Sequence, residues 1–426
     1  MTSLLWPGDE RAGDLLSDAA VLVAMAVVEE AWLEALVAVE VAPPDAGGVR
    51  LSELVGDGDV VGVAADAEGT GTPVVPLVGL LRDRLAGRHP SAALWLHRGL
   101  TSQDVLDTGL VLCLRDVFDR QREELRAQVQ ALTGLARWHR ATPMTGRTLT
   151  QHAVPITFGL KAATWLEALL DAAEDVETVG VRWPVQIGGA AGTLAAPAEL
   201  ARLAGLEDPP AVAVDLVRRT ASALGLRAGP PWQTARAPLT RAGDALVRCT
   251  DGYGRIADDV LVLARPEIGE LHEPAARDGR PRGGSSTMPQ KANPVLATLM
   301  RRAALSAPAL GAQLHLAAAA SVDERSPGAW HAEWAALQLL GRRTLVAASQ
   351  ATELVAGLHV DQERMRSTLE AAGGGLLAER RALAELFPGA EPAVTRDEDP
   401  TSYLGAADAL VDAVLRRAAA YLGEAS

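Results

Sequence analysis

The sequence predicts an all-α protein whose long helices pack side by side in a bundle. Long stretches are rich in Ala, Leu, Arg and Glu, and few runs alternate β-branched with polar residues as strands do. Apolar residues make up 48% of the chain but aromatic residues only 4%, so aliphatic side chains are expected to fill a large core. Residues 101–140 also repeat their apolar positions at helical spacing.

The first hundred residues are expected to form a small N-terminal helical domain. Residues 17–40 make up the first predicted helix, which ends before Pro43 and Pro44 because proline cannot continue a helix. Residues 50–100 contain frequent Gly and Pro and are expected to break into shorter pieces.

Five long helices are expected next, as a central bundle over residues 101–357. The first would be about 57 Å long at a rise of 1.5 Å per residue, which is too long for a compact core and suits a bundle. Pro155 favours the start of the second helix, and Asn293 is expected to cap a helix that begins at Pro294. The five predicted helices cover residues 101–140, 155–179, 238–265, 294–319 and 329–357. Residues 358–426 are expected to form a small C-terminal helical region.

The formal net charge of −14 argues against nucleic acid or an anionic membrane as the main partner. Any anionic substrate must therefore meet a locally basic pocket. Cys113 and Cys249 are too few for a disulfide framework, and neither has a Cys or His neighbour at metal-ligand spacing. The N-terminal residues lack the basic start of a signal peptide, and the apolar run from Ala19 to Val28 is about half as long as a membrane span. These features predict a reduced, cytoplasmic protein.

Three polar segments that contain glycine precede predicted helices. The first is His97-Arg98-Gly99-Leu100-Thr101-Ser102-Gln103-Asp104. Thr101 and Asp104 have the spacing of a capping box, which explains these two residues but not their neighbours. A helix N-terminus with hydroxyl and free N–H groups also binds anions, so a cap and an anion site are both open interpretations.

The second segment runs from Gly146 to Pro155 and reads Gly-Arg-Thr-Leu-Thr-Gln-His-Ala-Val-Pro. A lone histidine here would most simply be a surface or capping residue. However, Arg147, two hydroxyls, the Gln151 amide and the His152 ring lie within six positions. This polar group is denser than a helix cap requires.

The third segment runs from Gly283 to Pro294 and reads Gly-Gly-Ser-Ser-Thr-Met-Pro-Gln-Lys-Ala-Asn-Pro. A mobile glycine- and serine-rich loop that ends on a helix cap is typical of an active-site lid. Lys291 is one of only two lysines in a chain that otherwise uses Arg, which indicates that this position needs a compact ammonium group. A flexible linker would not account for the Met-Pro-Gln-Lys-Ala-Asn-Pro run.

The third segment resembles the signature of the fumarase/aspartase superfamily, and the other two segments match that family in order and spacing. The resemblance extends over about residues 10–420. It implies three helical domains and a homotetramer around a central helical bundle. It also implies active sites assembled from three subunits, with one of the three segments from each.

The resemblance also indicates one branch of that superfamily. Many members carry a His directly after the Arg-Thr of the second segment and pair it with a Glu seven residues after the signature Lys, but here these positions are Leu149 and Thr298. The His three residues later, with the runs Gln186–Ala195 and Glu324–Trp334, is similar to the 3-carboxy-cis,cis-muconate cycloisomerases. That branch implies an intramolecular lyase that forms 4-carboxymuconolactone in the protocatechuate branch of the β-ketoadipate pathway.

The family resemblance implies a role for each residue of the expected site. Ser285 would carry the proton of the carbon next to a carboxylate, and His152 would be a second acid/base group. The side chains implied to hold a small polycarboxylate substrate are Thr101, Ser102, Arg147, Gln151, Lys291, Asn293 and Arg325. Neither a metal nor an organic cofactor is implied.

Two other functions stay open. One is a lyase of the same superfamily that releases an amine or nitrite from a succinate skeleton, as in adenylosuccinate or nitrosuccinate cleavage. The missing His/Glu pair argues against adenylosuccinate. The other is a structural protein without activity, against which the intact Ser285, Lys291, Asn293 and His152 argue.

Overall fold

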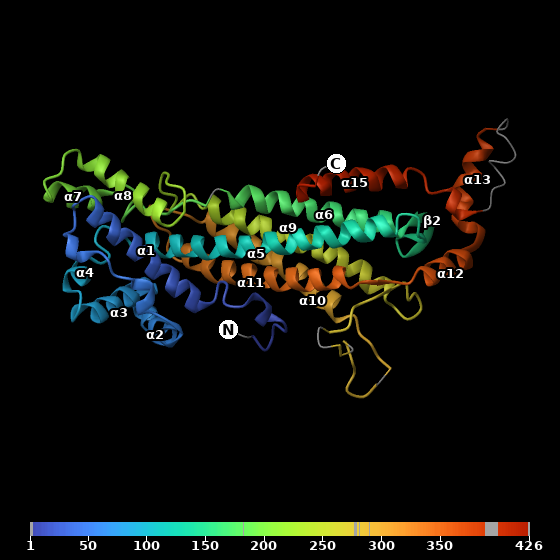
Figure 1. Cartoon of the computed structure of the whole chain (residues 1–426), viewed down its shortest axis with the longest axis horizontal. Helices are drawn as coiled ribbons and strands as arrows, with labels where there is room; N and C mark the ends of the chain where they lie inside the picture. Colours follow the sequence, from blue (N-terminus) through green and yellow to red (C-terminus); the bar gives the residue numbers. More distant parts are fainter. Residues whose placement is uncertain are drawn as a thin grey trace. The chain divides into compact units, whose positions relative to one another are not determined.

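The computed structural model describes residues 3–181, 183–276, 279–280, 282–288, 290–387 and 399–424, so Pro289 of the third segment lies outside the described residues. The described part is mainly helical, as predicted, with a few short strands (Figure 1). No helix in it is both long and apolar enough to cross a membrane. The chain divides into two compact units, which we describe separately. The first comprises residues 1–121, 176–247 and 307–346, and the second residues 122–175, 248–306 and 347–426.

The five long helices are present, and each predicted one has a counterpart. They are α5 (Ser102–Trp138), α6 (Phe158–Gly180), α9 (Ala237–Leu263), α10 (Val295–Ala319) and α11 (Ala329–Ala356). The boundaries between the two units fall inside these helices. The division into three domains that the sequence suggested stays a prediction.

The first unit adds six shorter helices to its parts of the long ones. They are α1 (Asp18–Ala38), α2 (Val60–Thr70), α3 (Val74–Ala86), α4 (Pro90–Trp95), α7 (Ala195–Leu203) and α8 (Pro209–Ala223). The Ser17 hydroxyl caps α1 by accepting a hydrogen bond from the N–H of Ala20 at 3.1 Å. α1 buries Trp32, whose indole N–H donates to the carbonyl of Arg98 at 2.7 Å. This contact holds the first polar segment against the core of the unit.

Within its described residues, the second unit adds two small antiparallel sheets and three helices. The strands are β1 (Pro143–Thr148) with β2 (Gln151–Thr157), and β3 (Leu271–His272) with β4 (His359–Val360). The helices are α12 (Gln362–Ala372), α13 (Ala378–Glu385) and α15 (Ala407–Leu422). α15 lies beside α6 in Figure 1, and Arg417 of α15 pairs with Asp171 at 2.7 Å and Glu167 at 2.8 Å of α6. Short 3-10 helices in the described residues cover Asp9–Ala12, Pro44–Ala46, Leu51–Leu54, Asp57–Asp59, Gly373–Leu377 and Pro400–Ser402.

The few aromatic side chains mark the core of each unit. In the first unit, Phe118 and Trp183 pack edge to face with ring centroids 5.0 Å apart. In the second, the ring of Phe158 contacts both His139 at 5.2 Å and Trp165 at 5.7 Å. Aliphatic side chains fill most of the remaining core, as the composition predicted.

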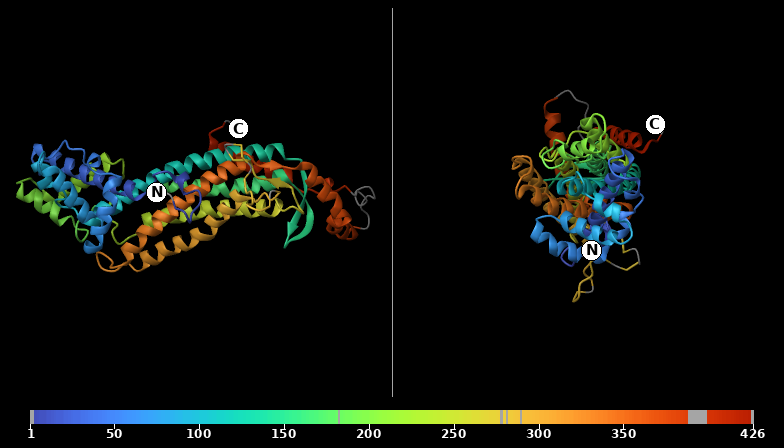
Figure 2. Two further views of the ribbon diagram at one scale, coloured as in Figure 1. Left: turned by 90° about the horizontal axis from the view of Figure 1, so that it is seen from below. Right: turned by 90° about the vertical axis from the view of Figure 1, so that its left-hand side faces the viewer.

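The prediction that a helix starts at Pro155 is wrong. Pro155 lies in β2, opposite Thr145 of β1, and the hairpin projects beyond the end of α6 in Figure 2. A two-residue turn at Leu149 and Thr150 lets residues 143–157 fold back on themselves, and this pairing uses the backbone groups that a helix would need. α6 begins only at Phe158. The Thr157 hydroxyl caps it by accepting a hydrogen bond from the N–H of Leu160 at 3.1 Å.

Candidate functional site

In the first unit, the structure brings Thr101 and Arg325 together from distant parts of the chain. Arg325 precedes α11, and its Nη2 donates to Thr101 Oγ1 at 2.6 Å while its Nε donates to Gln103 Oε1 at 3.2 Å. The guanidinium also lies 5.9 Å from the centre of the Trp330 ring. Ser102 opens α5 and is half-buried. These side chains form a half-buried cationic and hydroxyl group at a helix N-terminus.

Asp104 completes only half of the expected capping box. Its carboxylate accepts the backbone N–H of Thr101 at 3.0 Å, but the Thr101 hydroxyl is bound to Arg325 instead of returning the bond. The same carboxylate accepts the N–H groups of Gly188 at 2.8 Å and Gly189 at 3.0 Å. Burial raises the pKa of Asp104 to about 6, against the opposing effect of these N–H donors. Asp104 thus joins the start of α5 to the glycine-rich loop at 186–192.

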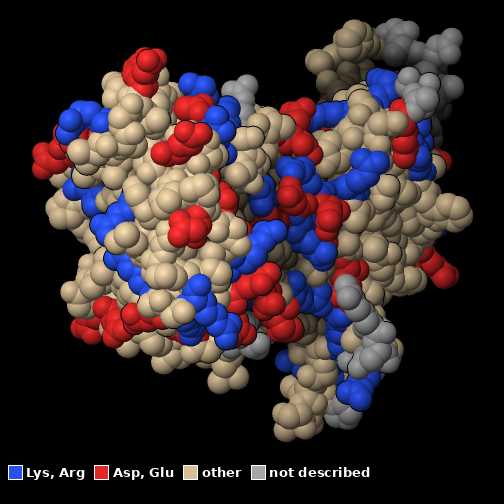
Figure 3. Space-filling view, turned by 60° about the vertical axis from the view of Figure 1, so that its left-hand side comes forward, with Lys and Arg blue, Asp and Glu red and all other residues tan. Residues whose placement is uncertain are grey.

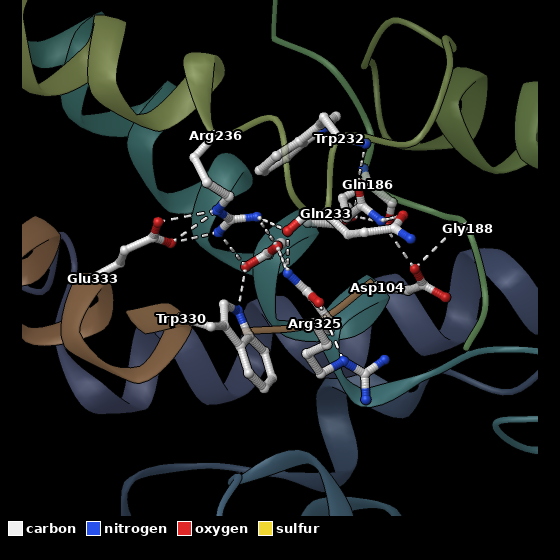
Figure 4. Close-up of polar contacts among 12 residues, drawn as sticks. Asp104, Gln186, Gly188, Trp232, Gln233, Arg236, Arg325, Trp330 and Glu333 are labelled. Carbon is white, nitrogen blue, oxygen red and sulfur yellow. Dashed lines mark hydrogen bonds and ion pairs between the residues drawn. The ribbon is translucent and has the colours of Figure 1, made fainter. Parts of the chain in front are cut away.

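A buried ion triad is formed by Arg236, Asp107 and Glu333 next to these side chains. It was not predicted from the sequence. Arg236 donates to Asp107 at 2.6 and 3.1 Å and to Glu333 at 2.6 and 3.0 Å. Trp330 adds an indole N–H to Asp107 at 2.9 Å (Figure 4). All four side chains are nearly inaccessible, and burial raises the pKa of Glu333 despite its contact with Arg236. The only signal in the sequence is an acidic Asp107 among the apolar residues of α5.

In the second unit, Arg147 is bound to a buried carboxylate. Its two terminal nitrogens donate to the two oxygens of Glu270 at 2.7 and 3.1 Å, and Glu270 is fully buried. Such a bidentate pair fixes the guanidinium in one orientation. The ion pair with Glu270 therefore anchors β1 of the hairpin. Glu270 was not predicted from the sequence.

The tip of the hairpin is exposed and strained. Leu149 and Thr150 have φ angles of 48° and 71°, a region that β-branched and bulky residues rarely adopt. The Leu149 side chain is 96% exposed, and Gln151 and His152 are exposed too. The His152 ring has no hydrogen bond to any residue that the structure describes. Backbone strain of this kind persists at functional sites, where other contacts compensate for it.

The third segment holds the Ser285 hydroxyl between two backbone donors. Ser285 Oγ accepts the N–H of Thr287 at 3.3 Å and that of Met288 at 3.2 Å. The serine is half-buried and Lys291 is exposed. Hydrogen bonds to an oxygen favour its charged form, so this turn stabilises a Ser285 alkoxide.

Asn293 closes the base of this loop, and the prediction that it caps α10 is wrong. Its backbone N–H and its Nδ2 both donate to the carbonyl of Gly283, at 3.0 and 2.7 Å. The Glu273 carboxylate instead accepts the N–H groups of Leu296 at 2.9 Å and Ala297 at 2.7 Å. It thus occupies the N-terminus of the helix, where a carboxylate is favoured by the helix dipole. Burial raises the pKa of Glu273 against these bonds.

The start of the loop is anchored as well. Arg282 pairs with Glu353 of α11. Gly283 has a φ of 69°, and a side chain there would collide with Asn293. Within the described part of the second unit, no hydrogen bond or ion pair joins Ser285, Lys291 or Asn293 to Arg147, Gln151 or His152. One chain therefore presents the hairpin and the loop as separate groups.

Charges of both signs are interspersed on the face of the molecule in Figure 3, without a large patch of one sign. Local arrangement thus determines where an anion can bind. Among the described residues, no three His, Cys, Asp or Glu side chains are placed to hold a metal ion.

Comparisons with known proteins agree with the expected family. A sequence model of a family described as "Lyase" matches residues 14–308. Nitrosuccinate lyase from Streptomyces davaonensis is 42% identical over 93% of this chain and 90% of its own length. The 3-carboxy-cis,cis-muconate cycloisomerase of Bradyrhizobium diazoefficiens is 39% identical over 75% of this chain and 68% of its own. The crystal structure of the 3-carboxy-cis,cis-muconate lactonizing enzyme from Pseudomonas putida superposes with a TM-score of 0.82 at 30% identity, covering 96% of this chain and 97% of that one.

Proposed function

The chain belongs to the fumarase/aspartase superfamily of lyases, and from that premise we propose that it eliminates nitrite from nitrosuccinate. Ser285 is the proposed base, and Thr101, Ser102, Lys291, Asn293 and Arg325 are the proposed carboxylate-binding residues. The choice of substrate is supported by the 42% identity to a nitrosuccinate lyase over nearly the full length of both chains.

The observation that carries the proposed chemistry is the environment of Ser285. A serine hydroxyl is a poor base in water, so an active-site serine needs donors that favour its alkoxide. Two backbone N–H groups meet Ser285 Oγ, and Lys291 follows six residues later in the same closed loop. Lys291 adds a positive charge to this segment.

The proposed reaction is a β-elimination in which bonds and charges balance. The Ser285 alkoxide takes a proton from the CH₂ carbon next to one carboxylate, and the electron pair passes into that carboxylate as an aci-carboxylate. The pair then forms the carbon–carbon double bond of fumarate as the C–N bond breaks, and nitrite leaves with the electrons of that bond. Lys291 and Arg325 would meet the negative charge that develops on the carboxylate.

The leaving-group side of the site also favours a weakly basic group. Superfamily members that release an amine or water need an acid to protonate it, whereas nitrite leaves as a stable anion. The family's His/Glu pair is replaced here by Leu149 and Thr298. Leu149 is almost fully exposed, and the Thr298 hydroxyl donates to the carbonyl of Pro294 at 2.7 Å within its own helix. Neither side chain can act as an acid.

A second candidate function is the cycloisomerisation of 3-carboxy-cis,cis-muconate, which the sequence analysis placed first. The TM-score of 0.82 to the lactonizing enzyme favours it. This reaction also has a weakly basic group on the leaving-group side. A carboxylate oxygen adds to the double bond in one direction and leaves in the other, and a carboxylate is weakly basic. His152 is the proposed second acid/base group of the cycloisomerisation, whereas the release of nitrite needs no acid from it.

We further propose that the active chain is a homotetramer in which the three segments of one site come from three copies. The separate hairpin and loop in the second unit and the exposed Leu149 support this assembly. Light scattering is expected to give the mass of four chains. A stable and fully active monomer would contradict the shared site.

The experiment that tests the function compares both substrates with the purified protein. Nitrosuccinate is expected to yield nitrite and fumarate in equal amounts, and 3-carboxymuconate to react at least a hundredfold more slowly. The reverse preference would establish the cycloisomerase. Turnover of neither substrate would exclude both proposals.

A further inference from the structure

Gln103 is a buried amide that links the ion triad to Arg325. It lies in the first turn of α5 and is 1% exposed. Its Nε2 donates to Asp107 Oδ2 at 3.2 Å and to the carbonyl of Gln233 at 2.9 Å. Its Oε1 accepts the Nε–H of Arg325 at 3.2 Å. The amide therefore has an acceptor pair on one side and a cation on the other.

The partners of Gln103 allow only one orientation of its amide. A reversed amide would set its oxygen against the Asp107 carboxylate and the Gln233 carbonyl, and its NH₂ against the Arg325 N–H. All three contacts would then join groups of the same kind, and each partner of Gln103 would lose its hydrogen bond. The carbonyl of Gln103 is thus held toward Arg325.

We propose that Gln103 is a positioning residue that fixes the Arg325 guanidinium beside Thr101 for a substrate carboxylate; this inference rests on the proposed anion-binding role of Arg325. Gln103 uses the Nε–H of Arg325, and Thr101 takes a bond from Nη2. Arginine has five N–H donors, so the remaining ones can meet a carboxylate.

The ion triad gives this arrangement its rigidity. Asp107 is itself held by two bonds from Arg236 and one from Trp330, so the acceptor that orients Gln103 cannot rotate away. The route from Glu333 through Arg236 and Asp107 to Gln103 is buried throughout. Side chains that are locked by such supporting bonds hold a ligand-binding group in place.

The test replaces Gln103 by a side chain of similar shape that cannot form these bonds. Gln103→Met is expected to lower kcat/KM by at least tenfold, mainly by raising KM, because Arg325 loses its fixed position. The matched control is Gln128→Met. Gln128 is equally buried and donates two bonds, to the Ala348 carbonyl at 2.9 Å and Thr352 Oγ1 at 3.0 Å, and neither partner is a proposed site residue. We expect it to lose a similar amount of stability and to keep kcat/KM within twofold.

A double-mutant cycle tests whether Gln103 acts through Arg325. If it does, Gln103→Met combined with Arg325→Met will have the same kcat/KM as Arg325→Met alone, within twofold. The proposal would be overturned if the effects of the two substitutions on kcat/KM multiply, or if Gln103→Met leaves KM unchanged. If Gln103→Met fails to fold, Gln103→Asn is measured in its place, because its shorter amide cannot reach both sides.

Failure of the proposed function is distinguished by a structural readout. If the wild-type protein turns over neither substrate, the proposed function fails, and Gln103 is judged from a crystal structure of the Gln103→Met variant. Loss of the hydrogen bond between Arg325 and Thr101 would support the positioning role. An unchanged Arg325 would overturn it.

Discussion

The residues around Arg325 in the first unit and the Ser285 loop in the second are built in opposite ways. Around Arg325, Asp104 and Asp107 are fully buried, and several donors from distant parts of the chain hold each of them. In the described part of the loop, Ser285 Oγ accepts hydrogen bonds from the nearby N–H groups of Thr287 and Met288 alone, and Lys291 is exposed. One chain thus completes the first arrangement by itself but leaves the second open.

This difference suits the two tasks that we propose for the two regions. A carboxylate-binding group gains from being fixed before the substrate arrives, because fixed donors need no reorganisation during the reaction. A loop that carries the base must admit the substrate first and exclude water afterwards, so it is anchored at its ends and free in between. Arg282 and Asn293 supply such anchors at the two ends of the Ser285 loop.

The largest expected effect is on the loop side. Ser285→Ala should lower turnover by about three orders of magnitude, within the ~10²–10⁴-fold range of general acid–base groups, while the fold stays intact. Ser306→Ala is the control, since its hydroxyl only donates to the Ala303 carbonyl within α10. Steady-state kinetics and circular dichroism check both variants. A Ser285→Ala protein with more than a tenth of wild-type turnover would place the base elsewhere.

The next effect is on the stability of the first unit. Arg236→Met leaves the carboxylates of Asp107 and Glu333 buried without their cation, which is expected to cost about 3–5 kcal/mol of unfolding free energy. The control is Arg202→Met, which breaks an exposed pair with Glu199 and should change stability little. Denaturant titration compares them, and equal stabilities would mean that the triad is not structural.

Asp104 is expected to make stability depend on pH. Burial raises its pKa to about 6, so the folded protein binds this proton more tightly than the unfolded chain does. Its contribution to stability is therefore present at low pH and is lost as the pH rises from about 4 to about 6, by on the order of 2–3 kcal/mol. Asp104→Asn should remove that part of the slope. If the unfolding free energies of the two proteins change in parallel with pH, the raised pKa of Asp104 would be contradicted.

Lys291 tests whether the exposed loop carries part of the anion site. Lys291→Met should lower kcat and raise KM, so that kcat/KM falls by about tenfold. The reason is that one ammonium would meet both the bound carboxylate and the aci-carboxylate. Lys291→Arg keeps the positive charge but should recover only part of that loss, because a guanidinium is larger and planar. Lys161→Met is the control, as its ammonium pairs with Asp259 at 3.3 Å inside the second unit. Kinetics within twofold of wild type for Lys291→Met would remove Lys291 from the site.

The smallest effect concerns the strained hairpin. Replacing Leu149 and Thr150 by Asn and Gly gives the turn residues that suit two positive φ angles, and should stabilise the fold by about 1 kcal/mol. If the tip also contacts another copy, activity will fall although stability rises. Thermal unfolding and turnover of the Leu149→Asn/Thr150→Gly variant measure both. Unchanged stability would show that the turn is not strained.

The sequence by itself determined the helices and the chemistry of the segments. Apolar periodicity over residues 101–140 predicted the longest helix because a helix buries one face, and that spacing is visible along the chain. The signature around Ser285 and Lys291 predicted the family, since it is a continuous run. The hairpin was missed because Pro155 suits both a helix start and an edge strand, and only the pairing of residues 143–157 decides between them.

Only the tertiary structure decided which polar residues meet. Arg325 and Thr101 are 224 positions apart, and Arg236 and Glu333 are 97 apart, so no local pattern predicts either pair. The same holds for Glu273, whose carboxylate occupies the N-terminus of α10 although no local pattern links it to that helix. Buried charges and amides find partners wherever folding brings a complementary group within hydrogen-bond distance, and that distance is set by the packing of helices rather than by spacing along the chain.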